Sequence, residues 1–359
     1  MDTPTREQVM QQLGTVMDPE LHRDLVTLNM VKDVAVNGGN VRVHVELTTP
    51  ACPLKDQISR EVAAAVRSIP GVNDVEVEFS AVVRGRGRRD GVLQGVKNIV
   101  AVGAGKGGVG KSTAAVLLAV GLRRKGAKVG LMDADVYGPS IPTMLGVEGT
   151  QPAVRGEMIL PIEAAGVKVM SMGFMVDRDK PLIWRGPMVH SVVKQFIEQV
   201  DWGELDYLIV DLPPGTGDVP LTLAQAIPMT GSVVICTPQD VALMDARRAV
   251  LMYNQLNVPC LGIIENMSYY ICPKCGHRDE IFDHGGAEGL ARELNVPFLG
   301  GIPLNARIRE YGDAGTPERT FTDGDGEVSA AVEAVAAATA GQISVRNLEA
   351  TAEPSLSIE

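Results

Sequence analysis

Two stretches of this 359-residue sequence combine residue types and spacings that could do chemistry: a glycine-rich loop with two lysines, and a pair of cysteines. The cysteines, Cys272 and Cys275, stand in the stretch "YYICPKCGHRD" with two residues between them. Such a pair can form a redox disulfide, half of a zinc site or half of an iron–sulfur site. A zinc ion or a cluster usually takes four ligands, so either metal requires ligands from elsewhere.

The glycine-rich loop, "GAGKGGVGKST", follows the apolar run "NIVAV" and precedes an apolar helical stretch. Gly105, Gly110, Lys111 and Ser112 satisfy the pattern G-x-x-x-x-G-K-[ST] in the strand–loop–helix context that it requires. Backbone N–H groups would surround the phosphates, Lys111 would reach the β- and γ-phosphates, and Ser112 would ligate Mg²⁺. The loop residues predicted to bind nucleotide are Gly105, Lys106, Gly107, Gly108, Val109, Gly110, Lys111, Ser112 and Thr113.

The sequence around this loop alternates between short apolar runs and helical stretches. Continuous apolar runs such as "KVGLMDAD", "YLIVDLP" and "SVVICTP" recur from Lys97 onward. Such runs are typical of parallel strands that crossover helices bury on both faces. We therefore expect an α/β fold, with a doubly wound, mainly parallel P-loop NTPase domain over residues 97–341.

A small α/β domain is expected before it, over residues 1–80. Two alternating runs, "MVKDVAV" and "VRVHVEL", flank "NGGN" as in a hairpin, and an amphipathic helical stretch and a further alternating run follow. Residues 81–96 are rich in Gly and Arg and without apolar period, which predicts a linker. Residues 342–359 carry little periodic apolar content, so we expect a loose tail there.

Composition and charge argue against two classes of partner. A net charge of −11 leaves no general basic surface for sequence-independent binding of nucleic acid. The N-terminus does not resemble a signal peptide, and we find no apolar run of about 18 residues that could span a bilayer. We expect a cytoplasmic protein without nucleic-acid or membrane partners. In that reducing compartment the cysteines are free thiols or metal ligands, and Cys236 and Cys260, within strand runs, are expected in the core.

The doubled lysine of "GKGGVGKST" resembles the deviant Walker A motif of the SIMIBI class of ATPases. In that class the extra lysine, here Lys106, reaches the partner's nucleotide across a sandwich dimer. "DADVYGPS" resembles the first switch, in which Asp135 would orient the attacking water, with Asp133 as the alternative residue. "DLPPGTGD" resembles the second switch, in which Asp211 would hold Mg²⁺ through water; a carboxylate that ends a strand beside a P-loop is also expected on general grounds. Asn266 in "ENMS" resembles the residue that reads the adenine edge; alternatively it is a strand-end asparagine that hydrogen-bonds to backbone.

Within this class, "DVYGPSIP", "WRGPM", "DLPPGTGD" and "ENMSYYICPKCG" together resemble the Mrp/ApbC family of iron–sulfur carriers. The likeness covers the chain from Lys97 to Gly326. In the first domain, "DPEL" and "TTPACPL" resemble the PaaD-like metal–sulfur assembly domain. Cys52 lies in the second of these motifs, either as a reactive or transient ligand or as an ordinary half-buried thiol.

The resemblance implies an ATP-hydrolysing carrier that uses ATP and Mg²⁺ and holds a [4Fe–4S] cluster. In a two-fold homodimer, Cys272 and Cys275 of both subunits would supply the four thiolates of the cluster. The implied partners are apo iron–sulfur proteins as recipients, and scaffold or donor proteins as the source of the cluster.

Several other functions compete with this interpretation. "CPKCGH" also resembles half of a zinc knuckle, to which His277 could add a nitrogen ligand, as in a zinc-stabilised P-loop ATPase. A MinD- or ParA-like positioning ATPase needs a C-terminal amphipathic helix or a basic face, and "EPSLSIE" offers neither. A reductase like the nitrogenase iron protein places its cluster ligands on separate segments. A thioredoxin-like pair is disfavoured because the motif does not open a helix after the first strand.

Overall fold

The computed structural model describes residues 3–85, 93, 95–175, 186–323 and 326–352. The chain divides into two compact units. Unit 1 comprises Met1–Arg84 together with Ser344–Glu359, and unit 2 comprises Gly85–Ile343. Of the expected linker, residues 86–92 and 94 lie outside the described residues, as does the first part of "WRGPM".

Unit 1 packs two helices against one three-stranded sheet. Strands β3 (Val31–Asn37) and β4 (Asn40–Leu47) form an antiparallel hairpin, and β5 (Asp74–Ala81) pairs with β4 in parallel. The parallel pair is joined by the crossover helix α2 (Lys55–Arg67), as parallel pairing requires. Helix α1 (Arg6–Leu13) begins with a capping box, in which the Thr5 hydroxyl accepts from the Gln8 N–H. The short strands β1 (Met17–Asp18) and β2 (Arg23–Asp24) form a separate pair.

Unit 2 is built on a nine-stranded sheet with the order β10-β11-β7-β12-β6-β13-β14-β15, and β16 also pairs with β14. The interior strands run parallel, whereas β10 and β15 pair antiparallel with their neighbours. Its strands are β6 (Val96–Gly103), β7 (Val129–Asp133), β10 (Ile162–Ala164), β11 (Val167–Ser171), β12 (Leu205–Asp211), β13 (Gly231–Cys236), β14 (Cys260–Ile271), β15 (Arg278–Asp279) and β16 (Phe298–Leu304). A separate hairpin joins β8 (Val154–Arg155) and β9 (Met158–Ile159).

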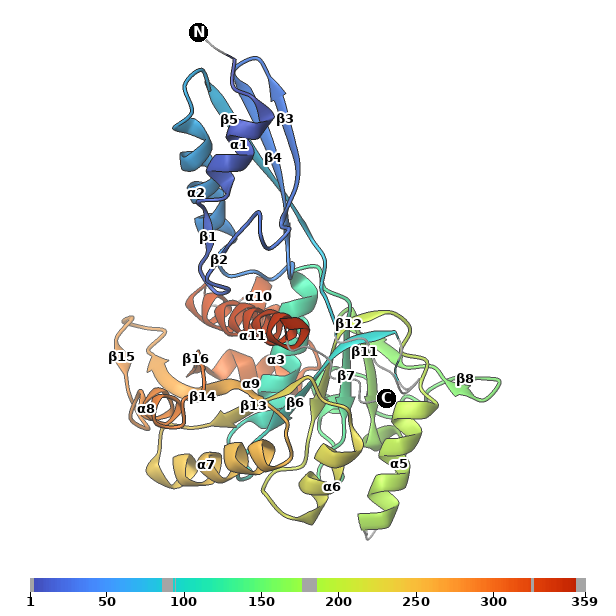
Figure 1. The fold of residues 1–359 in the computed structure, drawn as a ribbon. Coiled ribbons are helices and arrows are strands. Elements are labelled where there is room, and N and C mark those ends of the chain that lie inside the picture. Colours follow the sequence, from blue (N-terminus) through green and yellow to red (C-terminus); the bar gives the residue numbers. More distant parts are fainter. Residues whose placement is uncertain (1–2, 86–92, 94, 176–185, 324–325, 353–359) are drawn as a thin grey trace. The chain divides into compact units, whose positions relative to one another are not determined.

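Helices cover both faces of this sheet (Figure 1). The helices of unit 2 are α3 (Lys111–Arg124), α4 (Ile141–Met144), α5 (Gly186–Glu198), α6 (Asp218–Ala226), α7 (Asp240–Gln255), α8 (Gly286–Glu293), α9 (Ala306–Asp313) and α10 (Arg319–Thr322), with a 3₁₀ turn η1 at Met172–Phe174. Helices α5 to α8 share one core with the strands, and it contains Phe196, Leu223, Val250 and Leu290. Helix α3 covers the other face and packs on α11 (Gly326–Ala352), because Gly121 lets Ala336 approach closely.

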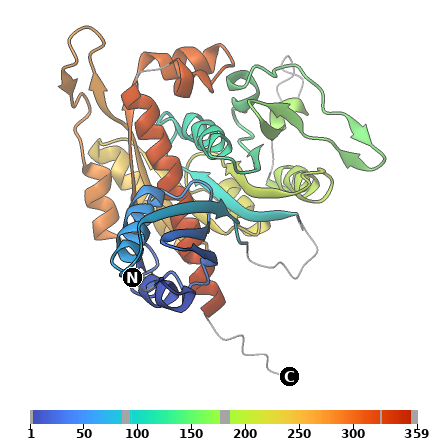
Figure 2. The ribbon, with the colours of Figure 1, turned by 90° about the horizontal axis from the view of Figure 1, so that it is seen from above.

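The C-terminal region differs from the loose tail that the sequence predicted for residues 342–359. Helix α11 is one long helix that continues to Ala352 (Figure 2). Ile343, Ser344 and Asn347 are buried in it, and the Asn347 amide donates to the carbonyl of Arg84 at 2.9 Å. The helix propagates from the alanine-rich segment before residue 342, so it needs no apolar period of its own there. Residues 353–359 lie outside the described residues.

Helix α11 also qualifies the expectation that no segment could span a bilayer. Within the described residues, Gly326–Glu349 is long and apolar enough to do so by length and composition. However, 56% of its most apolar window is buried inside the fold, and the core helix of a soluble protein meets the same criteria.

The close approach of α3 and α11 gives a first prediction. A Cβ at Gly121 would lie 3.0 Å from the Cβ of Ala336 and 3.6 Å from the Phe321 ring, so Gly121→Leu should overpack this contact. We expect a loss of about 1–3 kcal/mol in the free energy of unfolding, measured by urea titration. Gly289→Leu in α8 is the matched control, because no atom lies within 4 Å of the Cβ position there. Equal effects of the two substitutions would contradict the packing described.

Candidate functional site

The glycine-rich loop lies between β6, in the middle of the sheet, and α3, which begins at Lys111. Gly108 and Gly110 both have φ of +81°, a left-handed conformation that glycine adopts without steric cost. Gly105 meets α7 instead, since a Cβ there would lie 2.1 Å from the carbonyl oxygen of Asp245. The loop therefore needs glycine for two reasons, backbone conformation and close packing. Its Lys106 is half-buried and forms no ion pair with another described residue.

Lys111 is the centre of a buried polar cluster at the carboxyl ends of the strands. Its ammonium lies 2.7 Å from Oδ1 of Asp211 and 3.3 Å from Oδ2 of Asp135. The Ser112 hydroxyl donates to Oδ2 of Asp211 at 2.6 Å. The lysine side chain is only 6% exposed and that of Asp211 is fully buried, so neither charge is balanced by water. The three sequence-predicted residues Lys111, Ser112 and Asp211 thus meet in one place.

Asp133 and Asp211 stand opposite each other at the ends of β7 and β12. Burial raises the pKa of the Asp211 carboxyl, while the Lys111 ammonium and the Ser112 hydroxyl act in the other direction. Burial, together with the charge of Asp211, raises the pKa of Asp133 to about 8. The Asp133 carboxyl therefore favours its neutral form beside Asp211.

The two acidic residues of "DADVYGPS" have different surroundings. Both oxygens of Asp133 accept hydrogen bonds: Oδ1 from the Asp135 N–H at 3.2 Å, and Oδ2 from the Ile141 N–H at 3.3 Å and the Ser171 hydroxyl at 2.8 Å. Asp133 thereby holds the backbone of the segment after β7. Asp135 instead faces Lys111 and accepts from the N–H of Tyr137 at 3.2 Å. Of the two, Asp135 is the carboxylate beside the phosphate loop.

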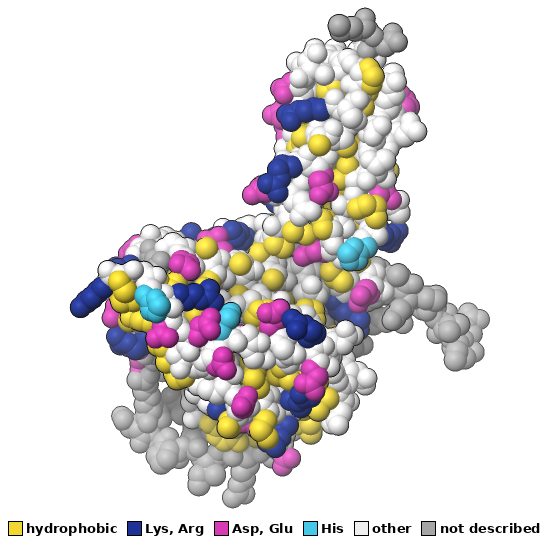
Figure 3. Space-filling view, turned by 90° about the vertical axis from the view of Figure 1, so that its left-hand side faces the viewer, with side chains coloured by type: hydrophobic (Ala, Val, Ile, Leu, Met, Phe, Trp, Pro, Cys, Tyr) yellow, Lys and Arg dark blue, Asp and Glu magenta, His cyan; other side chains and the backbone are white. Residues whose placement is uncertain are grey.

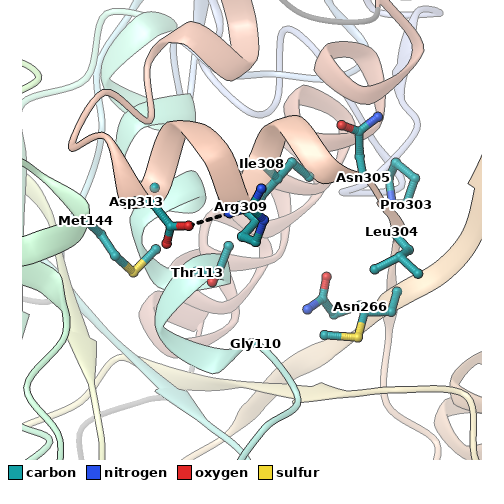
Figure 4. A pocket seen from close by; sticks show the side chains of 12 residues that line it. Gly110, Thr113, Met144, Asn266, Pro303, Leu304, Asn305, Ile308, Arg309 and Asp313 are labelled. Carbon is teal, nitrogen blue, oxygen red and sulfur yellow. Dashed lines mark hydrogen bonds and ion pairs between the residues drawn. The ribbon is translucent and has the colours of Figure 1, made fainter. Parts of the chain in front are cut away.

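A cavity of about 280 Å³ opens beside the loop (Figure 4). Asn266, in the middle of β14, lines it and donates its amide to the carbonyl of Val109 at 2.8 Å. A Cβ at Gly110 would lie 2.1 Å from that amide nitrogen, which explains the glycine. Because Nδ2 is used by the loop, the amide oxygen Oδ1 remains as an acceptor. The structure thus brings Asn266 and the phosphate loop together through a bond to the backbone, and a contact of Asn266 with adenine stays a prediction.

The rest of the cavity wall was not predicted from the sequence. It comes from α4, β16 and α9, and includes Met144, Pro303, Leu304, Asn305, Ile308, Arg309 and Asp313. Arg309 and Asp313 form an ion pair at 2.7 Å on the rim (Figure 4). A signal was present, since "GGIPLNARIRE" reads as a strand followed by an Asn helix cap. Whether this segment lies beside the glycine-rich loop depends on the order of the strands in the sheet, which no local sequence pattern predicts.

The cysteine pair lies on the turn between β14 and β15. The Cys272 N–H donates to the His277 carbonyl at 2.9 Å, and the Gly276 N–H donates to the Cys272 carbonyl at 2.8 Å. Cys272 is half-buried and Cys275 is exposed. Hydrogen bonds from the backbone of Lys274 and Cys275 lower the pKa of the Cys272 thiol, which favours the thiolate that binds metals. Nowhere in the described residues do three His, Cys, Asp or Glu side chains gather to hold a metal ion.

The other cysteines differ from this pair. Burial raises the pKa of Cys236 to about 12 and that of Cys260 to about 11, and both lie in core strands as expected. Cys52, in unit 1, is half-buried, and burial raises its pKa to about 11. The nearby carboxylates of Glu20 and Asp18 act in the same direction. Burial also raises the pKa of Glu20 to about 7, and the sequence did not single out this residue.

The surface charge agrees with the composition. On the face drawn in Figure 3, the Lys and Arg side chains of the described residues are interspersed with Asp and Glu and do not gather into one basic area.

A phosphate loop that opens a helix beside two strand-end carboxylates, on a doubly wound parallel sheet, defines a P-loop NTPase. The family model described as "NUBPL iron-transfer P-loop NTPase" matches residues 95–340, and the chain belongs to this family. A second model, "Iron-sulfur cluster assembly protein", matches residues 6–79. The family resemblance that the sequence motifs indicated is confirmed.

Two relatives are similar over nearly the whole chain. An iron–sulfur cluster carrier protein from Synechocystis sp. is 49% identical over 352 residues, which cover 96% of this chain and 99% of the relative. An iron–sulfur cluster carrier protein from Deinococcus radiodurans is 50% identical over 341 residues, which cover 95% of this chain and 96% of the relative.

Two solved structures confirm the expected α/β class. A nucleotide-binding protein in complex with ADP from Archaeoglobus fulgidus is 41% identical with a TM-score of 0.57, and the match covers 63% of this chain and 89% of that protein. The cell division ATPase MinD from Pyrococcus furiosus is 21% identical with a TM-score of 0.51, covering 71% of this chain and 99% of its own. The second likeness concerns the fold alone.

The surroundings of Asp133 and Asp135 predict different effects of replacing each carboxyl group with an amide. Asp135→Asn should bind Mg-ATP but turn it over about 10²–10⁴-fold more slowly, because an amide cannot orient or deprotonate water as a carboxylate does. Asp133→Asn should instead lose about 1–3 kcal/mol of stability, because its NH₂ group faces hydrogen-bond donors. Steady-state turnover and urea titration of both variants make the comparison. A stable, inactive Asp133→Asn beside an active Asp135→Asn would reverse the assignment.

Proposed function

We propose that this protein hydrolyses ATP and carries a [4Fe–4S] cluster, held between two copies of the chain, to recipient apoproteins. The observation that carries the proposal is the placement of two functional groups on one strand. β14 presents Asn266 to the cavity beside the phosphate loop and leads, at its end, into the turn that carries Cys272 and Cys275. The names of the similar carrier proteins support this reading.

The nucleotide chemistry follows from the buried cluster. Lys111 now neutralises Asp211 and Asp135, and the phosphates of ATP would draw its ammonium toward the loop. Hydroxyl and carboxylate oxygens are the ligands that Mg²⁺ prefers, so Ser112 and Asp211 fit this ion, which neutralises charge on the transferring phosphoryl group when bound. Asp135 would orient the attacking water. The similar protein in complex with ADP supports a nucleotide in this position.

The homodimer is supported by what surrounds the phosphate loop. Tyr137, in the segment after β7, is 67% exposed, and Val241 and Met244 of α7 are 65% and 58% exposed. Helix α7 contacts the phosphate loop at Gly105, so the exposed apolar side chains of α7 lie on the same side of the protein as the loop. A second copy would cover them and would bring the partner's equivalent of Lys106 to the nucleotide. Lys106, without an ion-pair partner among the described residues, is available for that contact.

The cluster is cargo, and its ligands come from both copies. One described chain offers two accessible sulfur ligands and no third His, Cys, Asp or Glu beside them. Two copies related by a two-fold axis supply four thiolates. The same observation disfavours zinc held within one chain, since His277 does not join the pair in a group of three. Recipients would be apo iron–sulfur proteins, and scaffold or donor proteins would supply the cluster to this carrier in the cytoplasm.

The two lysines of the loop should respond differently to substitution. Lys111→Ala removes the cation that binds phosphate and leaves Asp211 and Asp135 unbalanced, so both ATP binding and hydrolysis should be lost. Lys106→Ala should bind ATP normally but hydrolyse it roughly 10³-fold more slowly, as when a cation supplied across an interface is removed. Binding is measured by calorimetry and hydrolysis by phosphate release. If Lys106→Ala also loses ATP affinity, this lysine acts within its own subunit.

Anaerobic reconstitution with iron and sulfide tests the cargo. The proposal predicts about four iron and four sulfide per dimer, with broad brown absorption. Cys272→Ser or Cys275→Ser should remove the cluster and weaken the dimer while ATP binding persists. Cys260→Ala is the matched control and should keep the cluster, because that thiol lies in the core. A colourless protein with one zinc per subunit would overturn the carrier function.

A further inference from the structure

Strand β14 is interrupted between the nucleotide cavity and the cysteine turn. It pairs with β16 up to Asn266 and Ile302, and pairing resumes only at Tyr270 and Leu304, with a shift of register between. Met267, in this gap, has φ of +55°, a left-handed conformation that is unusual for a side chain of this size. The regular ladder therefore does not continue from the cavity to the turn.

A chain of side-chain hydrogen bonds bridges this gap. The Ser268 hydroxyl donates to Oε1 of Glu265 at 2.5 Å and lies 2.8 Å from Nδ1 of His284. Nε2 of His284 lies 3.2 Å from Nη2 of Arg278. We name these four residues the Glu265–Arg278 relay.

The direction of the hydrogen bonds in the relay follows from chemistry. An arginine only donates, so Nε2 of His284 accepts and the ring proton is on Nδ1. Nδ1–H then donates to the Ser268 oxygen, whose own proton goes to Glu265. Nδ1 of His284 also lies 3.3 Å from Oε1 of Glu265, so the relay reaches the Glu265 carboxylate both through Ser268 and directly.

The two ends of the relay contact different elements of the fold. Glu265 is fully buried, precedes Asn266 in the strand, and accepts from the N–H groups of Gly285 at 3.1 Å and Ala287 at 2.8 Å where α8 begins. At the other end, Arg278 pairs with Ile271, the residue before Cys272, across the β14–β15 hairpin. Its guanidinium also lies 4.0 Å from the centre of the Tyr269 ring.

Gly301 of β16 leaves room for the relay. A Cβ at this position would lie 2.7 Å from the Ser268 hydroxyl, so any side chain would push the serine away from its partners. The relay can therefore be disturbed from the neighbouring strand without changing any of its members.

We propose that the Glu265–Arg278 relay couples the nucleotide cavity to the cysteine turn, with His284 as a positioning residue for Cys272 and Cys275. Adenine bound against Asn266 displaces the adjacent Glu265, and the relay transmits this displacement to Arg278 and the hairpin that carries the thiols. The coupling of nucleotide to thiols needs no cluster; its use in cluster transfer rests on the proposed function.

Alkylation of the metal-free protein tests the coupling. The rates for Cys272 and Cys275 are measured by peptide mass spectrometry, with and without a non-hydrolysable Mg-ATP analogue. A coupling free energy of the usual size predicts a change of about fivefold or more in the wild type. In His284→Ala this nucleotide effect should disappear while affinity for the analogue stays the same. His284→Asn, whose amide can still donate to Ser268, should restore part of the effect, and His277→Ala on the same turn should behave as the wild type.

Gly301→Ala provides a second variant, which disturbs Ser268 and should reduce the nucleotide effect, while the direct contact between His284 and Glu265 keeps part of it. The dimer fraction is measured in the same samples, because a dimer could shield the thiols directly. The proposal fails if the wild type shows no nucleotide effect, if His284→Ala keeps it, or if Gly301→Ala leaves it undiminished. A protein that fails to take up iron and sulfide but keeps the relay-dependent alkylation would refute the carrier function and leave the coupling intact.

Discussion

The buried ammonium of Lys111 is the interaction on which the rest of the site depends. A lysine that is almost fully removed from water is costly unless a carboxylate accompanies it, and Asp211 and Asp135 lie within 2.7 and 3.3 Å. These carboxylates reach it only because β7, β12 and β6 lie side by side in parallel, so that their carboxyl ends share one edge of the sheet. Asp133, held by Ser171 and two backbone N–H groups, fixes the segment that carries Asp135. The charge cluster, and not the glycine loop alone, sets the geometry that a nucleotide meets.

Local spacing was enough to find the residues whose roles are set by neighbours in sequence. The loop from Gly105 to Thr113, the strand-end carboxylates and the cysteine pair all follow from short patterns, and the continuous apolar runs gave the α/β class. What could not be predicted depends on distant segments meeting. The cavity wall from α9 and β16 requires the pairing of β14 with β16, and the different roles of Asp133 and Asp135 follow from contacts with Ser171 and Lys111. The last turns of α11, after residue 341, were not predicted because they continue a helix that the alanine-rich residues before them begin.

Strand β14 connects the cavity beside the phosphate loop to the cysteine turn. A single strand that ran regularly from Asn266 to Ile271 would fix the cysteine turn rigidly to the sheet. The shift of register and the left-handed Met267 relax that constraint. Hydrogen bonds among the four side chains of the relay connect the two ends of the interrupted strand pairing. A hydrogen-bonded chain of side chains has a definite geometry but can break and re-form at lower cost than a strand pair inside a sheet.

The position of the two sulfur atoms has a consequence for handling the protein in air. Cys272 and Cys275 lie on the same short turn, and Cys275 is exposed while Cys272 is half-buried. The lowered pKa of Cys272 supplies the thiolate that an oxidant attacks first, and Cys275 is the adjacent thiol that resolves the product to a disulfide. An aerobic preparation would thus convert both thiols into a disulfide, which binds no metal, while the distant phosphate loop stays intact. Exposure to dioxygen during purification, and not the amino-acid sequence, would then decide whether a sample is coloured.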